Sequence, residues 1–336
     1  MGMIHYLSYE QTRGIKVAAV CELDPQRLAG DWRSIRGNFG PPGKEMDLTG
    51  ISRYAQIDEL IAAPDIELVD ICLPPALHAE VAIRALQAGK HVFCEKPIAL
   101  TAEDAKRMVS VAARAGRLLM IGHVLPFFPE YAYALDVVRT GRYGRLLGGT
   151  FRRVISDPQW LTGYYDPQKI GGPMLDLYVH DAHFIRLLCG MPRAVFTTGR
   201  MRGAVASWFT TQYQFADPAL AVTATSGVID QQGRTFTHGF EIHLEQATLL
   251  FDFAVIEGQP RQLMPLTVFD SAGRVQTPQL GSGDPVDAFQ IELAAVATAI
   301  GSGAPADILR GELARDAVVM CHKQTQSLKT GRIVKL

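Results

Sequence analysis

The chain has 336 residues, 48% of them hydrophobic and 20% charged, which is enough for two domains with buried cores. Lys and Arg number 33 against 34 Asp and Glu, so the formal net charge is -1, and the absence of a basic stripe argues against nucleic acid as a partner. No apolar run reaches the roughly 20 residues of a membrane span, and the five cysteines include no CxxC, so a reducing, cytoplasmic location is expected.

The first third of the chain alternates short apolar runs with helical patterns. We predict helices at 4–11, from 25, and at 57–62, 76–88 and 102–115, a turn-rich loop at 38–43, and strands at 16–21, 68–73, 91–94 and 118–122. Apolar strands such as LVDICL are typical of strands buried on both faces. The alternation therefore predicts a Rossmann-type, doubly wound parallel sheet over residues 1–123.

Beyond residue 123 the regular alternation of helices and strands ends. We predict helices at 130–139, 174–188, 286–300 and 312–328, and strands at 146–155, 194–200, 208–215, 221–228, 240–244 and 248–253. Several of these strands follow one another without an intervening helix. Residues 124–336 are therefore predicted to form an α+β domain on a mostly antiparallel sheet, suited to substrate binding and oligomerisation.

Ligands of a doubly wound sheet bind outside the carboxyl ends of its strands. Glu22 follows the strand at 16–21, where a carboxylate can accept hydrogen bonds from the adenosine ribose and repel a 2′-phosphate. Because no arginine follows directly, NAD is favoured over NADP. The alternative is a solvated acid at a strand end. Pro74 and His78 follow the next strand, either as a rigid wall for a flat ring or as a simple connection.

The segment GKHVFCEKP ends a strand in Glu95, Lys96 and Pro97. A lysine between a cofactor and a second domain can donate a hydrogen bond to a substrate oxygen or exchange a proton with it. Pro97 restricts the backbone, and a cis bond between Lys96 and Pro97 is compatible with the sequence. The alternative is an ordinary ion pair at the surface.

The second domain contains GGPMLDLYVHDAH at 171–183. Asp176 and His180 stand four residues apart, on one face of the predicted helix. An aspartate that accepts from one imidazole nitrogen leaves the other free as a base. His183 shares this face, so a metal site of Asp176, His180 and His183 is one alternative. The other is a pair that caps the helix beneath a loop.

Together these motifs resemble the glucose-fructose oxidoreductase, inositol dehydrogenase and MocA (Gfo/Idh/MocA) family of NAD(P)-dependent oxidoreductases. AGKHVFCEKP is similar to the strand that carries the family's catalytic lysine, and GGPMLDLYVHD to its GG-xxx-D-xxx-H helix. VDICLPPALHAEVAIRALQAGKH and AAVCELDPQRL match the segments that precede them in the fold. The likeness covers most of the chain.

The resemblance implies a set of site residues. The catalytic residues would be Lys96, Asp176 and His180. The residues near the dinucleotide would be Gly2, Met3, Glu22, Leu73, Pro74, His78, Glu95 and Lys96. The substrate would contact Lys96, His123, Asp176 and His180. The resemblance also implies NAD as cofactor, no metal, and a homo-oligomer formed through the sheet of the second domain.

The chain departs from the family pattern at two places. Pro126 stands where many relatives carry an arginine, which affects the expected substrate contacts. The opening MGMIHYLSYEQ resembles the end of a glycine-rich fingerprint without its first strand, a strand that would lie centrally between 16–21 and 68–73. Each buried side chain of that strand would stabilise by about 1.5–3 kcal/mol. We therefore expect the natural protein to start upstream. Because an upstream segment could carry an export signal, the location of the protein stays open. Without the glycine-rich strand, we expect this chain to bind a dinucleotide poorly.

The expected reaction is hydride transfer between nicotinamide and a hydroxyl carbon of a sugar, inositol or related cyclic polyol. His180, oriented by Asp176, would take the hydroxyl proton while Lys96 polarises the oxygen. Two other functions fit the same residues. One is a glycosidase that oxidises its substrate transiently with bound NAD, and the other is a non-catalytic sugar or nucleotide sensor.

Overall fold

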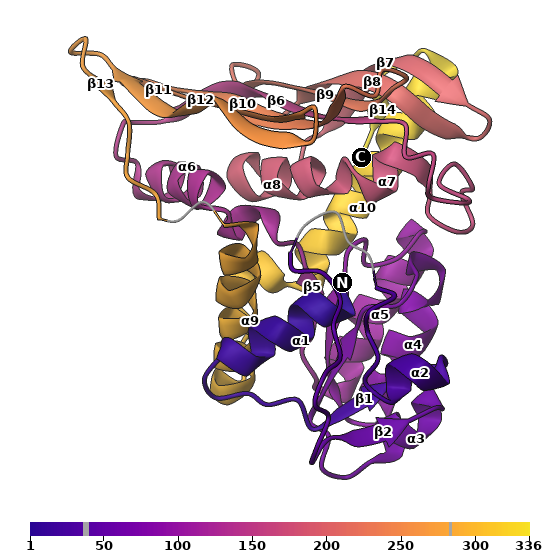
Figure 1. Cartoon of the computed structure of the whole chain (residues 1–336). Helices are drawn as coiled ribbons and strands as arrows, with labels where there is room; N and C mark the ends of the chain where they lie inside the picture. The colour runs from indigo at the N-terminus through magenta and orange to yellow at the C-terminus, as the bar shows by residue number, and fades with distance from the viewer. Residues whose placement is uncertain (36–39, 282–283) are drawn as a thin grey trace.

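The computed structural model describes residues 1–35, 40–281 and 284–336, whose elements form two units, one above the other in Figure 1. Residues 38 and 39 of the predicted turn at 38–43 lie outside the described residues. Parallel strands with flanking helices make up the lower unit, and a large sheet forms the upper one. The predicted combination of a Rossmann-type unit and an α+β unit is confirmed.

The lower unit alternates helices and strands as predicted, with one further strand, β2, that was not predicted. Its elements are α1 Gly2–Gln11, β1 Ala19–Cys21, α2 Pro25–Leu28, β2 Ser52–Tyr54, α3 Ile57–Ala62, β3 Leu68–Ile71, α4 Pro75–Gln87, β4 His91–Glu95, α5 Ala102–Ala115 and β5 Leu119–Gly122. Local chemistry sets the ends of α5. Thr101 Oγ1 accepts the N–H of Asp104 at 3.0 Å, and Gly116 closes the helix with a φ of 62°, which glycine adopts without strain.

These parallel strands form two separate sheets, β1-β2 and β3-β4-β5. Between β1 and β3 lies a cavity of about 1010 Å³, lined by residues 14–22 and 65–73, by α1 and by two residues of α9. Neither strand pairs with another described strand across it. A central strand between the strands at 16–21 and 68–73 would occupy this position.

The upper unit is built on a nine-stranded sheet. Its strands are β6 Leu146–Ser156, β7 Ala194–Arg202, β8 Val205–Gln214, β9 Ala221–Ile229, β10 Arg234–Leu244, β11 Ala247–Ile256, β12 Gln259–Asp270, β13 Val275–Gln276 and β14 Val334–Lys335, in the order β13-β12-β11-β10-β6-β9-β8-β7-β14. Neighbouring strands are antiparallel except for β6 and β9. The helices α6 Pro129–Thr140, α7 Gly172–Asp176 and α8 Val179–Cys189 lie on one face, as Figure 1 shows.

The C-terminal helices connect the two units. The helix α9 Pro285–Ser302 packs against α1, where Ile4, Phe289 and Leu293 share a buried cluster. The helix α10 Gly311–Thr330 contacts α5 in the lower unit and α8 and β7 in the upper one. Short 3₁₀ turns at Leu125–Phe127 and Asp307–Leu309 complete the connections. The expected boundary at residue 123 stays a prediction, because α9 belongs by sequence to the second part but packs on the first.

Two sequence predictions fail in the upper unit. The expected helix at 174–188 is divided into α7 and α8, because the N–H of Tyr178 bonds to the carbonyl of Pro173, five residues back, in place of the helical partner four residues back. The long strand β12 was not predicted, since its prolines at 260 and 265 oppose strand formation in a sequence pattern. Among the described helices, none combines the length and apolar character needed to cross a bilayer.

We predict that an extended apolar segment joined ahead of Met1 stabilises the protein by filling the cavity between β1 and β3. A strand of about seven Val- and Ile-rich residues would extend over ~23 Å at ~3.3 Å per residue. Each buried side chain adds about 1.5–3 kcal/mol, and each kcal/mol raises the Tm of a large domain by ~2–4 °C. Calorimetry should therefore show a Tm at least ~5 °C higher. The same segment with two prolines is the control, and equal Tm values for both fusions would contradict the prediction.

Candidate active site

Lys96 and Asp176 meet where the two units join. Lys96 follows directly on β4, at the carboxyl end of the parallel strands, and Asp176 ends α7. The Nζ of Lys96 donates to the backbone carbonyl of Asp176 at 2.7 Å and to its Oδ1 at 3.0 Å. The peptide bond between Lys96 and Pro97 is cis. The structure thus brings together two of the three residues predicted to be catalytic, from different units.

The predicted pairing of Asp176 with His180 is wrong. Asp176 ends α7 and His180 lies in the first turn of α8, because the helical hydrogen-bond pattern is interrupted at residues 177 and 178, although both keep right-handed helical dihedrals. The Asp176 carboxylate binds Lys96 instead, and His180 Nδ1 is buried without a hydrogen-bond partner among the described residues. Asp176 therefore orients the ammonium group rather than the imidazole.

His180 is nevertheless close enough to Lys96 for the lysine charge to lower the pKa of the histidine. Burial lowers the pKa of His180 well below its ordinary value, and the charges of Lys96 and Arg153 lower it further. The imidazole is therefore neutral at neutral pH and has a free lone pair. This protonation state is the one that a proton acceptor needs.

His123, predicted to contact substrate, lies behind this site. Its side chain is fully buried, and its ring stacks on that of His183 with centroids 4.0 Å apart and planes 7° apart. The ring of His180 meets His123 edge-on at 5.9 Å. Burial lowers the pKa values of His123 and His183, so both rings are neutral. His123 therefore supports the ring of His180, and a direct substrate contact is not what this packing provides.

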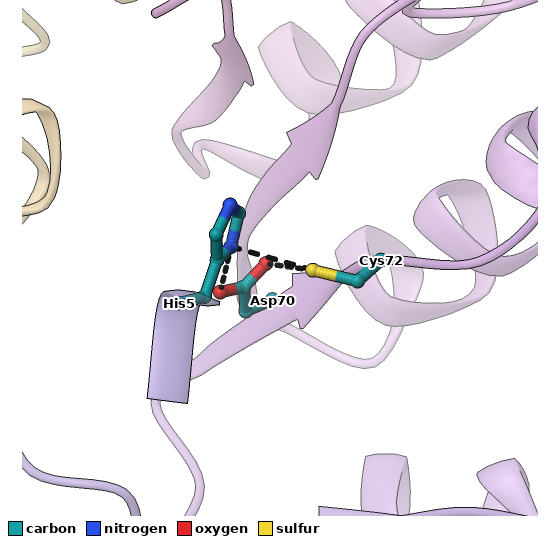
Figure 2. A group of neighbouring side chains, drawn as sticks. All are labelled: His5, Asp70 and Cys72. Atoms are coloured by element: carbon teal, nitrogen blue, oxygen red, sulfur yellow. Dashed lines mark hydrogen bonds and ion pairs between the residues drawn. The ribbon is translucent and has the colours of Figure 1, made fainter. Parts of the chain in front are cut away.

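Glu95 is also engaged within the protein. Its side chain is buried, one oxygen accepts from His5 Nε2 at 2.9 Å, and the other accepts the N–H of Lys96 at 3.1 Å. His5 Nδ1 bonds Asp70 Oδ2 at 2.8 Å, as Figure 2 shows. These bonds give Glu95 a supporting role, and its predicted contact with the cofactor stays a prediction. Sequence reasoning missed Asp70 altogether, because 65 residues separate it from His5.

Of the described residues, His5, Asp70 and Cys72 have ligand atoms within 4.8 Å of one another, as a metal site would require (Figure 2). His5 Nδ1 is already occupied by the bond to Asp70. Burial lowers the pKa of His5, but the charges of Asp70 and Cys72 and the hydrogen bonds to both together raise it well above its ordinary value. A protonated imidazole does not bind metal. Asp176, His180 and His183, the set considered from sequence, are not grouped in this way.

Glu22 stands at the carboxyl end of β1, as predicted for the residue that binds the adenosine ribose. Its Oε1 accepts the N–H groups of Leu23 and Asp24 at 2.7 and 3.1 Å, and the side chain remains half-exposed. Arg27 approaches its Oε2 to 4.0 Å. The sequence argument for NAD assumed that no arginine directly follows the strand, yet α2 brings Arg27 beside Glu22.

His78 holds two loops together. It is fully buried, with Nδ1 2.8 Å from the carbonyl of Pro97 and Nε2 2.8 Å from the carbonyl of Leu73. Burial lowers its pKa, while the hydrogen bonds to the two carbonyls offset part of this effect. The predicted contact of His78 with the cofactor stays a prediction. Leu73 lines the cavity, and Pro74 is the N-cap residue just before α4.

The start of α1 fits the anionic part of a dinucleotide. The N–H groups of Gly2 and Met3 have no partner inside the helix, because they belong to its first turn. Gly2 lines the cavity, and a Cβ there would lie 3.7 Å from Cys72 Cβ. The side chain of Met3 is buried beside Trp32, so only its backbone remains to bind a cofactor.

Two further polar groups near His180 were missed. The buried guanidinium of Arg153 in β6 donates to Asp181 Oδ2 at 2.5 Å, which fixes α8 against the sheet. The hydroxyl of Tyr164 is buried without a described partner, and the charge of Asp176 acts on it. In the sequence, the acid Asp181 directly after His180 was the available signal for a buried partner such as Arg153. Nothing in the local pattern marks Tyr164.

Comparison with known proteins agrees with this arrangement. The profile of the GFO/IDH/MocA oxidoreductase family, NAD-binding Rossmann fold, matches residues 5–123. The profile of the GFO/IDH/MocA C-terminal domain matches residues 131–250.

Relatives and solved structures point the same way. A 1,5-anhydro-D-fructose reductase of Ensifer adhaerens is 30% identical over 265 residues, 73% of this chain and 72% of the relative. An inositol 2-dehydrogenase of Pseudomonas savastanoi pv. phaseolicola (strain 1448A / Race 6) is 40% identical over 105 residues, 31% of each chain. A levoglucosan dehydrogenase solved with NADH and levoglucosan superimposes with a TM-score of 0.80 at 21% identity, covering 100% of this chain and 96% of that one. The chain belongs to the GFO/IDH/MocA family of oxidoreductases with an NAD-binding Rossmann domain.

Proposed function

We propose that the protein transfers a hydride between a hydroxyl carbon of a cyclic polyol, such as a sugar or inositol, and nicotinamide. The observation that carries this proposal is the contact of Lys96 Nζ with Asp176, at 2.7 and 3.0 Å. In this contact the Lys96 ammonium group lies at the strand ends of the NAD-binding unit and also touches the second unit. A substrate bound between the units would meet both.

Lys96 is oriented to bind the reacting oxygen. An ammonium group has three N–H donors, and two of them are used by the carbonyl and carboxylate of Asp176. The third remains to donate to a substrate hydroxyl or carbonyl oxygen. This hydrogen bond would stabilise negative charge that develops on the oxygen during the reaction.

His180 is the proposed proton acceptor. Its ring is neutral, because burial and the charge of Lys96 hold its pKa well below the ordinary value. NAD, when bound, supplies the hydride acceptor, while Gly2 and Glu22 are placed to hold its phosphate and ribose groups. The hydroxyl proton would pass to the imidazole as the carbon–hydrogen bond breaks. Asp176 contributes by holding Lys96 in place.

The substrate class rests on the relatives and on the polar groups near Lys96. Relatives are named for a 1,5-anhydro sugar and for inositol, and a structural neighbour was solved with levoglucosan. The buried Tyr164 hydroxyl has no described partner and offers a hydrogen bond to a polyol hydroxyl. A neutral polyol would satisfy it.

Association and location are part of the same proposal. The helices α6, α7 and α8 cover one face of the nine-stranded sheet, and the other face is open in Figure 1. Exposed Leu263 and Phe269 on β12 support contact with a second copy through that sheet.

Five free cysteines favour a reducing compartment such as the cytoplasm.

Removing Lys96 or His180 should abolish turnover without abolishing cofactor binding. We expect Lys96→Ala and His180→Ala each to lower kcat by about 10²-fold or more, as loss of a proton-transfer group does. The measurement is absorbance of reduced nicotinamide with a panel of sugars and inositols. NADH binding, followed by fluorescence, should persist. The form extended ahead of Met1 is used if the chain itself binds NADH weakly.

Lys106→Ala, an exposed lysine on α5, is the matched control and should retain full activity. Unchanged kcat in Lys96→Ala would contradict the assigned role. Hydrolysis of a glycoside without net change in NADH would indicate the NAD-using glycosidase instead. Binding of panel members without any turnover would indicate a sensor.

Glu22 should set the preference for NAD over NADP. In Glu22→Ser the carboxylate no longer repels a 2′-phosphate, and Arg27, which approaches Glu22 to 4.0 Å and Asp24 to 3.7 Å, loses one of these two acidic neighbours and can turn to bind it. We expect the ratio of kcat/KM for NADP to that for NAD to rise by about tenfold or more, equivalent to ~1.4 kcal/mol. The double variant with Arg27→Ala should lose this gain. A ratio that does not change in Glu22→Ser would refute the assignment.

A further inference from the structure

His5 is a buried imidazole whose two nitrogens both contact carboxylates. Nδ1 lies 2.8 Å from Asp70 Oδ2 on β3, and Nε2 lies 2.9 Å from Glu95 Oε1 on β4. The side chain is 1% exposed. Figure 2 shows His5 reaching from α1 toward Asp70 and Cys72 near the end of β3. One side chain thus connects a helix to two neighbouring strands.

The geometry fixes the charge of His5. Ionised carboxylates only accept hydrogen bonds, so both imidazole nitrogens must donate, and the ring is an imidazolium. Burial opposes this charge, but Asp70 and the Cys72 sulfur raise the pKa of His5 well above its ordinary value. Each contact is therefore a charge-assisted hydrogen bond, which is shorter and stronger than a neutral one.

Other titratable groups face this cluster. The hydroxyl of Tyr9 donates to Asp70 Oδ2 at 2.9 Å, and Cys72 Sγ lies 3.3 Å from His5 Nδ1. Glu292 on α9 is fully buried, and its carboxyl group has no described hydrogen-bond partner. Burial raises the pKa of Glu292, and the charges of Glu95 and Asp70 raise it further, so this group is neutral. The imidazolium is therefore the cation that balances Asp70 and Glu95.

Glu95 passes the constraint on to Lys96. Its Oε1 is held by His5, and its Oε2 accepts the backbone N–H of Lys96 at 3.1 Å. The Lys96 side chain then reaches Asp176 on the other unit. Hydrogen bonds thus connect His5 on α1 to Glu95, and Glu95 to the backbone of Lys96, whose side chain carries the ammonium group.

We propose that His5 is a positioning residue, which fixes the Glu95 carboxylate and through it the backbone from which Lys96 reaches Asp176. This inference rests on the function proposed for Lys96. It also connects the two halves of the site. The helix α1 offers its first N–H groups to the cofactor phosphates, and the same helix holds the strand end that carries Lys96.

The test is His5→Gln, whose single amide group donates from one end and can satisfy only one of the two carboxylates. We expect kcat to fall by about tenfold or more, since small displacements of a catalytic group have effects of up to 10²-fold. KM for the sugar and Kd for NADH should stay within about twofold. His243→Gln, a half-exposed histidine on β10, is the matched control and should behave as the parent protein.

A second readout is independent of turnover. Lys96 is 19% exposed and paired with Asp176, so an amine-reactive ester should label it slowly, and peptide mass spectrometry follows the rate against exposed Lys106. In His5→Gln the labelling of Lys96 should be several-fold faster. If no sugar in the panel is turned over, the proposed function fails, but the labelling result still decides whether His5 positions Lys96.

The proposal is overturned if His5→Gln lowers Tm while kcat and the labelling rate of Lys96 stay at the parent values, because His5 would then be merely structural. If His5→Gln does not fold, Asp70→Asn and Glu95→Gln replace it. Glu95→Gln, which weakens the bond next to Lys96, should then change kcat and labelling more than Asp70→Asn does. Equal effects of these two variants would equally overturn the proposal.

Discussion

The ion pair between Lys96 and Asp176 is the constraint on which the site depends. It joins the carboxyl end of β4 to the end of α7, so it sets how the two units meet at the proposed reaction centre. The two side chains are 19% and 31% exposed, and pairs with this degree of exposure contribute only ~0–1 kcal/mol to stability. Its importance is therefore geometric. Two acceptors on Asp176 leave the ammonium group one donor for a substrate.

The lower unit places Lys96 although its sheet is interrupted. A cavity separates β1 from β3. No described strand therefore joins the two sheets beneath α1. Packing on α9 and the charged hydrogen bonds of His5 hold the helix instead. The residues that fit the cofactor border this cavity, whereas Lys96 belongs to the continuous sheet β3-β4-β5. The interruption of the sheet therefore does not extend to the strand that carries Lys96.

Local patterns predicted the strand ends well, because a strand followed by Glu95, Lys96 and Pro97 is a contiguous signal. They failed where distant contacts decide. The spacing of Asp176 and His180 is helical, yet the N–H of Tyr178 bonds to the carbonyl of Pro173, five residues back, and interrupts the helical hydrogen bonds between them. The bond of His5 to Glu95 spans 90 residues, and no periodicity encodes it. Arg27 is five residues beyond Glu22 in sequence but approaches it through the turn into α2.

Charge balance around the site bears on the kind of substrate. Lys96 is offset by Asp176, and the buried guanidinium of Arg153 is offset by Asp181. His180 between them is neutral, since burial and both cations lower its pKa. An anionic substrate would have to compete with Asp176 for Lys96 and would leave that carboxylate uncompensated in a partly buried place. A neutral polyol needs only hydrogen bonds, so the electrostatics of the site agree with the cyclic polyol proposed as substrate.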